Sequence, residues 1–204
     1  MHPRSAAWDR FWESTKIGSM EWHEGIGYDL EALRAMTDAE RAEVVLLLGA
    51  RPQDWRAVEA YGVVNTTEAR AALGEALRSG SAETRLHAAN KLHDLGEPIA
   101  LDEIGAKELS SVTLLDGMSV ALRIAARVPT PAVRRALLDG ARDRPEVAFH
   151  FAATLCSVAG LGRATFGSEL RPFLLRLGPH SPRQERRAAF GELCRRLGMT
   201  AEEP

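Results

Sequence analysis

Two histidines occupy equivalent positions in two similar segments, and imidazole is the side chain best suited to switch charge, bind metal or make polar contacts near neutral pH. His87 lies in the segment 83–92 and His150 in the segment 146–155, which are offset by 63 positions. Glu, His, Ala and Leu recur at the same spacing in both segments. This repetition predicts that both histidines project from equivalent helices toward one partner. The alternative is that each is a half-buried, hydrogen-bonded residue near a seam between repeats.

Further polar residues follow His87 at helical spacing. Asn90, Lys91 and Asp94 lie three, four and seven residues after it, so a helix would place them on one polar stripe. We therefore predict that His87, Asn90, Lys91, Asp94 and His150 contribute to a binding surface.

A second candidate surface lies in the N-terminal third, where Trp22, His23 and Glu24 occupy an expected loop over residues 17–28. Trp and Tyr are over-represented in binding hot spots. Nearby acidic residues would suit a basic partner, namely Glu21, Glu24, Asp29 and Glu31. The alternative is that the aromatic residues of this region pack the open first end of a repeat array. These aromatic residues are Trp8, Phe11, Trp12, Trp22, Tyr28 and Trp55.

Motifs for catalysis or metal binding are missing from the sequence. No pair of histidines has the i, i+4 spacing of a zinc-binding helix, and there is no Cys-x-x-Cys or Gly-x-Ser-x-Gly. The two cysteines, Cys156 and Cys194, lie among apolar residues and have no histidine nearby in sequence, which predicts buried, reduced thiols. We expect no catalytic residue, no metal and no cofactor, and hence a protein that is not an enzyme.

The last expected helix is rich in arginine. Arginine can bind phosphate or an acidic protein surface. Glutamates at 185 and 192 interleave with these residues and instead favour a solvated face. The arginines are Arg183, Arg186, Arg187, Arg195 and Arg196.

Helical hairpins position the candidate residues. One hairpin is predicted over 67–92 with a turn at 79–81, and another over 130–155 with a turn at 143–145, because apolar residues follow a helical period in each. A weaker unit is expected over 99–128, with Leu114 and Leu115 in its second helix. No useful strand-like alternation occurs.

Capping motifs predict several other helix ends. Asp29 begins one helix, and Thr37 with Glu40 forms a capping box for a helix that stops at Gly49. A helix is predicted from Pro52 to Gly62, and Ser181-Pro182 is expected to open the last one with proline at its first position. A short helix over about 5–13 would bring Trp8, Phe11 and Trp12 to one face.

Composition is ordinary for a globular protein, with 45% hydrophobic and 26% charged residues over 204 positions. A formal charge of -2 disfavours a nucleic-acid-binding protein, which usually carries a basic surplus. The N-terminus lacks the apolar core of a signal peptide, and no apolar run is long enough to span a bilayer. We therefore expect a bacterial cytoplasmic protein without membrane contact.

The segments 83–92 and 146–155 resemble the second helix of HEAT-like repeats, and Pro145-Glu146-Val147 matches its typical start. The resemblance covers about residues 66–160. The whole chain is also similar to a group of bacterial HEAT-like proteins with segments like Lys16-Ile-Gly18, Trp22-His23 and Asp54 to Glu59. Small HEAT-like proteins are frequent among the immunity proteins of bacterial toxin systems, so the resemblance implies binding to a toxin domain.

The sequence thus predicts an all-α, single-domain HEAT-like solenoid over 1–204. Its parts are an N-terminal helical region (1–65), repeats (66–160) and C-terminal capping helices (161–204). We expect a non-catalytic protein that binds and occludes a toxin domain. Two alternatives remain open, a HEAT-like DNA-binding protein of the DNA glycosylase type and a HEAT-like chromophore lyase or chaperone. The sequence leaves the partner, the binding face and the oligomeric state open.

Overall fold

The computed structural model of the chain describes residues 4–51, 54–162 and 168–199. All regular secondary structure in these ranges is helical, which confirms the all-α prediction. The chain divides into two compact units, Met1–Ile99 (unit 1) and Ala100–Pro204 (unit 2). This division falls inside the segment 66–160.

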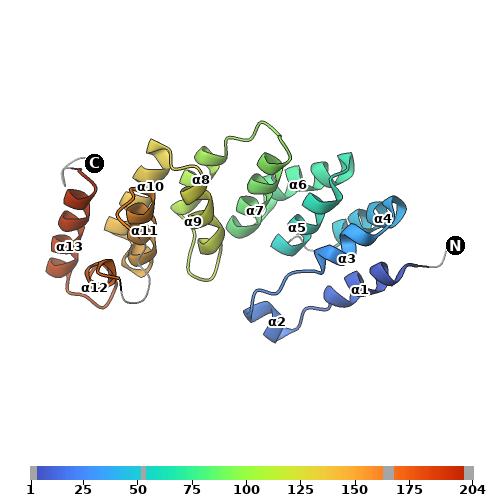
Figure 1. The fold of residues 1–204 in the computed structure, drawn as a ribbon, viewed down its shortest axis with the longest axis horizontal. Helices are drawn as coiled ribbons and strands as arrows, with labels where there is room; N and C mark the ends of the chain where they lie inside the picture. The colour runs from blue at the N-terminus through green and yellow to red at the C-terminus, as the bar shows by residue number, and fades with distance from the viewer. Residues whose placement is uncertain (1–3, 52–53, 163–167, 200–204) are drawn as a thin grey trace. The chain divides into compact units, whose positions relative to one another are not determined.

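Each unit is a set of short helices (Figure 1). The helices of unit 1 are α1 (Ala6–Ser14), α2 (Ser19–His23), α3 (Leu30–Ala35), α4 (Asp38–Gly49), α5 (Trp55–Val64), α6 (Thr67–Ser79) and α7 (Ala82–Asp94). Those of unit 2 are α8 (Leu101–Leu109), α9 (Met118–Arg127), α10 (Pro131–Asp143), α11 (Pro145–Val158), α12 (Leu170–Leu175) and α13 (Arg183–Arg196).

The offset of 63 positions extends well beyond the predicted hairpin. Helices α4, α5 and α7 begin at residues 38, 55 and 82, and adding 63 gives 101, 118 and 145, the first residues of α8, α9 and α11. Helix α6 begins at 67 and α10 at 131, one residue away from the same offset. The repeated block therefore has four helices, α4–α7 in unit 1 and α8–α11 in unit 2.

Helix packing is similar in the two blocks with one difference, because α5 also packs against α6, whereas α9 and α10 are not packed against each other to a comparable extent. In unit 1, α4 packs against α5 and α6, and α7 packs against α5 and α6. In unit 2, α8 packs against α9 and α10, and α11 also packs against α9 and α10. Unit 1 adds α3, which packs against α1 and α5, while unit 2 adds α12 against α11 and α13 against α10.

Buried residues confirm the register that the sequence predicted. Ala89 and Ala152 are fully buried, and Leu92 and Leu155 are nearly so. Both cysteines are free and buried, as expected. The Thr37 capping box is present, with Glu40 accepting from the Thr37 backbone, and Asp29 accepts a hydrogen bond from the Ala32 amide.

The two blocks fill their cores with different pairs of side chains. Phe151 on α11 is fully buried, and a Cβ atom at Gly140 on α10 would overlap its ring. Helices α6 and α10 follow an offset of 64, as their first residues and their N-caps show, so the equivalent positions in unit 1 hold Ala76 and Ala88, both fully buried. The space between the two helices is thus filled by two alanines in unit 1 and by a glycine with a phenylalanine in unit 2.

Four local predictions were wrong. A short helix, α2, interrupts the expected loop over 17–28. Helix α5 continues past Gly62 to Val64 and ends at Asn65, whose left-handed backbone closes it. Helix α13 starts at Arg183 after Pro182, and no side chain caps it. The predicted start of α5 at Pro52 lies outside the described residues.

The fourth error concerns Leu114 and Leu115, which precede α9 instead of belonging to it. They sit on a tight turn in which the Thr113 and Asp116 backbones hydrogen-bond to each other at 3.0 and 3.2 Å. The two side chains are 57% and 92% exposed. Apolar periodicity alone assigned both leucines wrongly to the helix. In the described part of unit 2, neither side chain is covered by other residues to any large extent.

Candidate functional site

His87 belongs to a cluster of polar side chains between α5 and α7, which we call the α5–α7 cluster. Glu59 on α5 is its centre: one carboxylate oxygen lies 3.1 Å from Nδ1 of His87, and the other lies 2.6 Å from Nζ of Lys91. The three side chains are only partly exposed, at 21% for Glu59, 12% for His87 and 26% for Lys91. The spacing of His87 and Lys91, one helical turn apart, lets both reach the same carboxylate.

Trp55 completes the cluster. Its ring stacks on the His87 imidazole, with centroids 5.4 Å apart and an interplanar angle of 27°. On α5, the Arg56 guanidinium lies 4.6 Å from the Trp55 ring centroid. Arg56 is itself buried and donates to the Ile26 carbonyl at 2.7 Å, so it ties the loop after α2 to α5.

The charge state of Glu59 follows from its neighbours. Burial alone would raise the pKa of Glu59, but hydrogen bonds from His87 and Lys91 outweigh it, so the pKa lies below its ordinary value. The carboxylate is therefore ionised at neutral pH and is a weak base. Such a group holds its two partners in place and is poorly suited to accept a proton in catalysis.

The second block lacks this cluster. Adding 63 to Trp55, Glu59 and Lys91 gives Met118, Leu122 and Thr154. Only the histidine is kept, as His150, which is exposed and lies with its ring edge against Phe149. Partial burial lowers the pKa of His150. The block can thus be built without the polar groups of the α5–α7 cluster.

The backbone near Lys91 carries a matching difference. A Cβ atom at Gly62 would lie 2.8 Å from Cδ of Lys91, so the lysine stem passes over a position that has no side chain. The position equivalent to Gly62 is Ala125, and the position equivalent to Lys91 is Thr154. The glycine in unit 1 therefore leaves room for the lysine stem that reaches Glu59, and unit 2 has neither residue.

The other predicted partner-binding residues belong to three places in the chain: the end of α2, helix α7 and unit 2. Trp22 and His23 end α2, and their side chains lie outside what the structure describes. Glu24 follows them and is exposed. On α7, Asn90 donates to Asp94 at 3.3 Å along the predicted polar stripe. His150 belongs to unit 2, so a joint role with His87 stays a prediction.

The loop after α2 does approach the cluster. A Cβ atom at Gly27 would lie 3.6 Å from the Trp55 ring. The structure thus brings the segment that follows Glu24 close to the residue that stacks on His87.

Three of the N-terminal aromatic residues contact one another on α1. Trp8 and Phe11 are buried, and Trp12 contacts both rings with centroids 5.4 and 5.3 Å away. This confirms that the three share one face of α1. A hollow of about 290 Å³ lies beside Trp8 and Trp12, with Leu47 and Arg51 as its other lining residues.

Charge is distributed unevenly between the two units. Residues 1–99 hold 11 Lys and Arg against 16 Asp and Glu, a formal charge of -5. Since the whole chain carries -2, residues 100–204 carry +3. The α5–α7 cluster therefore belongs to an acidic unit, which would attract a basic partner.

Across the ranges that the structure describes, no three His, Cys, Asp or Glu side chains gather as a metal site. None of the helices in those ranges is long and apolar enough to cross a bilayer.

Sequence inspection identified His87 and Lys91 but missed Glu59 as their shared partner. The sequence did contain a signal for Glu59. At the offset of 63, Trp55 corresponds to Met118 and Glu59 to Leu122, so two positions that are apolar in the second copy are aromatic and acidic in the first. Comparison of the chain with protein-family models, curated proteins and solved structures found no match.

Proposed function

We propose that this chain is a non-catalytic protein-binding protein of HEAT-like architecture whose partner contacts the α5–α7 cluster. The observation that carries the proposal is that this cluster occurs in only one of two otherwise equivalent blocks. A feature required by the helix packing would be expected in both. HEAT-like stacking is supported by the matching helix pairs within each unit.

The composition of the cluster suits a protein interface. Trp and Arg are among the residue types most enriched in binding hot spots, and the Trp55 ring contacts both Arg56 and His87. The Glu59 carboxylate fixes His87 and Lys91 in one conformation before binding, which reduces the entropy lost when a partner docks.

The proposed partner is a bacterial toxin domain that the chain inhibits by occlusion. A toxin that acts on nucleic acid has a basic cleft, and the charge of -5 on unit 1 would steer such a cleft toward it. Two exposed acidic residues would supply rim contacts: Asp94 on α7, and Glu24 in the loop whose later residues contact α5. Covering the toxin's active site would block its substrate without any chemistry by this chain.

The two alternatives have weaker support. A DNA glycosylase-type protein needs a long basic groove; unit 1 is acidic, and the charge of +3 on unit 2 is small for one. A chromophore lyase or chaperone needs an apolar cleft, and the hollow beside Trp8 and Trp12 is small for one, at about 290 Å³.

The proposal is tested by capturing the full-length chain from its native host and identifying any stoichiometric protein partner by mass spectrometry. The partner is then expressed alone and together with the chain in a second host. We expect the partner to be toxic alone and harmless with the chain. A chain without a stoichiometric partner, or a partner whose toxicity the chain leaves unchanged, would contradict the proposal.

The repeat supplies a matched control for the binding face. His87→Ala and His150→Ala remove the same side chain from the same register of two blocks. We expect His87→Ala to weaken partner binding by about tenfold or more, as for a hot-spot contact, and His150→Ala to leave it within about twofold. No loss with His87→Ala would contradict the proposed binding face, and equal losses would mean that the binding surface is not confined to the α5–α7 cluster.

A further inference from the structure

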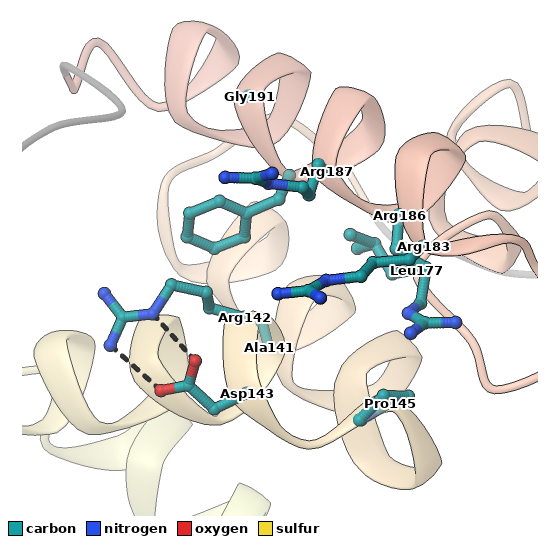
Figure 2. A pocket seen from close by; sticks show the side chains of 10 residues that line it. Ala141, Arg142, Asp143, Pro145, Leu177, Arg183, Arg186, Arg187 and Gly191 are labelled. Carbon is teal, nitrogen blue, oxygen red and sulfur yellow. Dashed lines mark hydrogen bonds and ion pairs between the residues drawn. The ribbon is translucent and has the colours of Figure 1, made fainter.

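Unit 2 contains a pocket of about 530 Å³ that the protein-binding proposal does not use. It lies between the C-terminal end of α10 and the N-terminal half of α13 (Figure 2). Three arginines of α13 line it on one side, Arg183, Arg186 and Arg187, and Arg142 of α10 lines the other. Arg142 is paired with Asp139 and Asp143, so the three guanidinium groups of α13 are the ones that make the pocket attractive to anions.

Most of this positive charge is not balanced within the pocket. Asp143 is the one acidic residue among the described residues that line it, and both of its oxygens accept from Arg142 at 2.9 Å. These hydrogen bonds hold the pKa of Asp143 below its ordinary value, so its negative charge is paired with Arg142 and does not neutralise the arginines of α13. Arg183 and Arg187 have no ion-pair partner in the described ranges and stay available to a ligand.

The position of the arginines on the helix adds to this effect. Arg183, Arg186 and Arg187 occupy the first five residues of α13, where the helix dipole already contributes positive potential. No side chain caps this end. Cations at a helix N-terminus are unfavourable, and a bound anion would remove that penalty.

The remaining walls of the pocket are apolar. They include the half-buried ring of Phe190, together with Leu177 and Pro145. A free phosphate ion would need neither an aromatic wall nor this much space, because pockets of about 300–1,000 Å³ usually hold organic ligands. A ligand with a phosphate at one end and a flat ring at the other would use both kinds of wall.

We propose that this pocket binds a nucleoside phosphate, with the α13 arginines on the phosphate and Phe190 against the base. Arginine's planar fork pairs with two phosphate oxygens at once, and base–aromatic stacking contributes to affinity independently of base identity. The proposal stands apart from partner binding by unit 1, since the two sites share no residue.

Isothermal titration of the full-length chain with ADP, pyrophosphate and adenosine tests the proposal. We expect saturable binding of ADP, weaker binding of pyrophosphate, and no binding of adenosine alone. Pyrophosphate binding as tight as ADP would overturn the role of Phe190 and with it the nucleotide assignment. Absence of saturable ADP binding at millimolar concentration would overturn the site itself.

Variants of one helix locate the site. Arg187→Gln should weaken ADP binding by about tenfold or more, because each charge-assisted contact to phosphate is strong. The control is Arg195→Gln, which removes the same charge from the exposed far end of α13. A twofold or smaller effect is expected there. Equal weakening by both variants would mean that net charge alone attracts ADP, and the pocket would be rejected.

Discussion

The helix pairs α5–α7 and α9–α11 share a register and a packing arrangement, but they differ in what they place between the two helices. Unit 1 has Trp55, Glu59 and Lys91 around its histidine, whereas unit 2 has Met118, Leu122 and Thr154. In unit 1 the histidine is paired and stacked, and in unit 2 it is exposed. One scaffold thus accommodates a polar–aromatic site or apolar packing at the same positions.

This difference separates what the fold requires from what a site adds. The alanines and leucines common to α7 and α11 are buried in both, so they belong to the helix packing. Side chains that change between the copies are free to serve a partner, and function is expected to lie in such additions to a common fold.

The largest effect is expected from exchanging core residues between the copies. Phe151→Ala should lower the free energy of unfolding by about 3–5 kcal/mol, because it leaves a cavity next to Gly140. Adding Gly140→Ala, which installs the equivalent of Ala76, should recover part of this loss. Urea denaturation followed by circular dichroism measures both.

Gly140→Ala alone is the control for that exchange. It should be destabilising by about 1–3 kcal/mol, since the added Cβ atom overlaps the Phe151 ring. If the double variant is no more stable than Phe151→Ala, the two copies do not share one packing scheme.

A smaller effect is expected at Gly62. Alanine at this helical position should gain about 1 kcal/mol of helix propensity, but in the wild type it displaces Lys91 from Glu59. In a Lys91→Thr background, which copies unit 2, the gain should appear in full. Urea denaturation of the four proteins gives a double-mutant cycle, and an identical effect of Gly62→Ala in both backgrounds would refute the coupling.

The smallest expected effect is a pH dependence. Because the pKa of Glu59 is lower in the folded protein than its unfolded value of about 4.3, ionised Glu59 stabilises the fold above that pH. This contribution disappears as the pH falls through the folded pKa. The difference in unfolding free energy between wild type and Glu59→Leu should therefore shift against the wild type between about pH 5 and pH 3. A constant difference would show that Glu59 gains nothing from His87 and Lys91.

The sequence predicted the helices and much of the core, because apolar periodicity and capping residues are local signals. Thr37 with Glu40, and Ala89 with Ala152, behave as their spacing indicated. It failed at Leu114 and Leu115, where hydrophobicity suggested burial but the chain makes an exposed turn. Whether an apolar residue is covered depends on the rest of the fold, which local periodicity does not contain.

The candidate site was predicted only in part, for a similar reason. His87 and Lys91 share one helix face and could be grouped from their spacing, whereas Glu59 is 28 residues before His87 and meets it only through packing of α5 on α7. The sequence showed the arginines of α13. The pocket that they form also depends on the end of α10, where Arg142 donates hydrogen bonds to Asp143 and so pairs with its charge.

The central claim is that the α5–α7 cluster serves binding and is not required by the fold. The most direct test is the free energy of unfolding of the Glu59→Leu/Lys91→Thr variant, which installs the residues of the second block. We predict a value within about 1 kcal/mol of the wild type or above it, as is common when a buried ion pair is replaced by packed apolar groups. A loss of about 3 kcal/mol or more would contradict the account and make the cluster a structural element of unit 1.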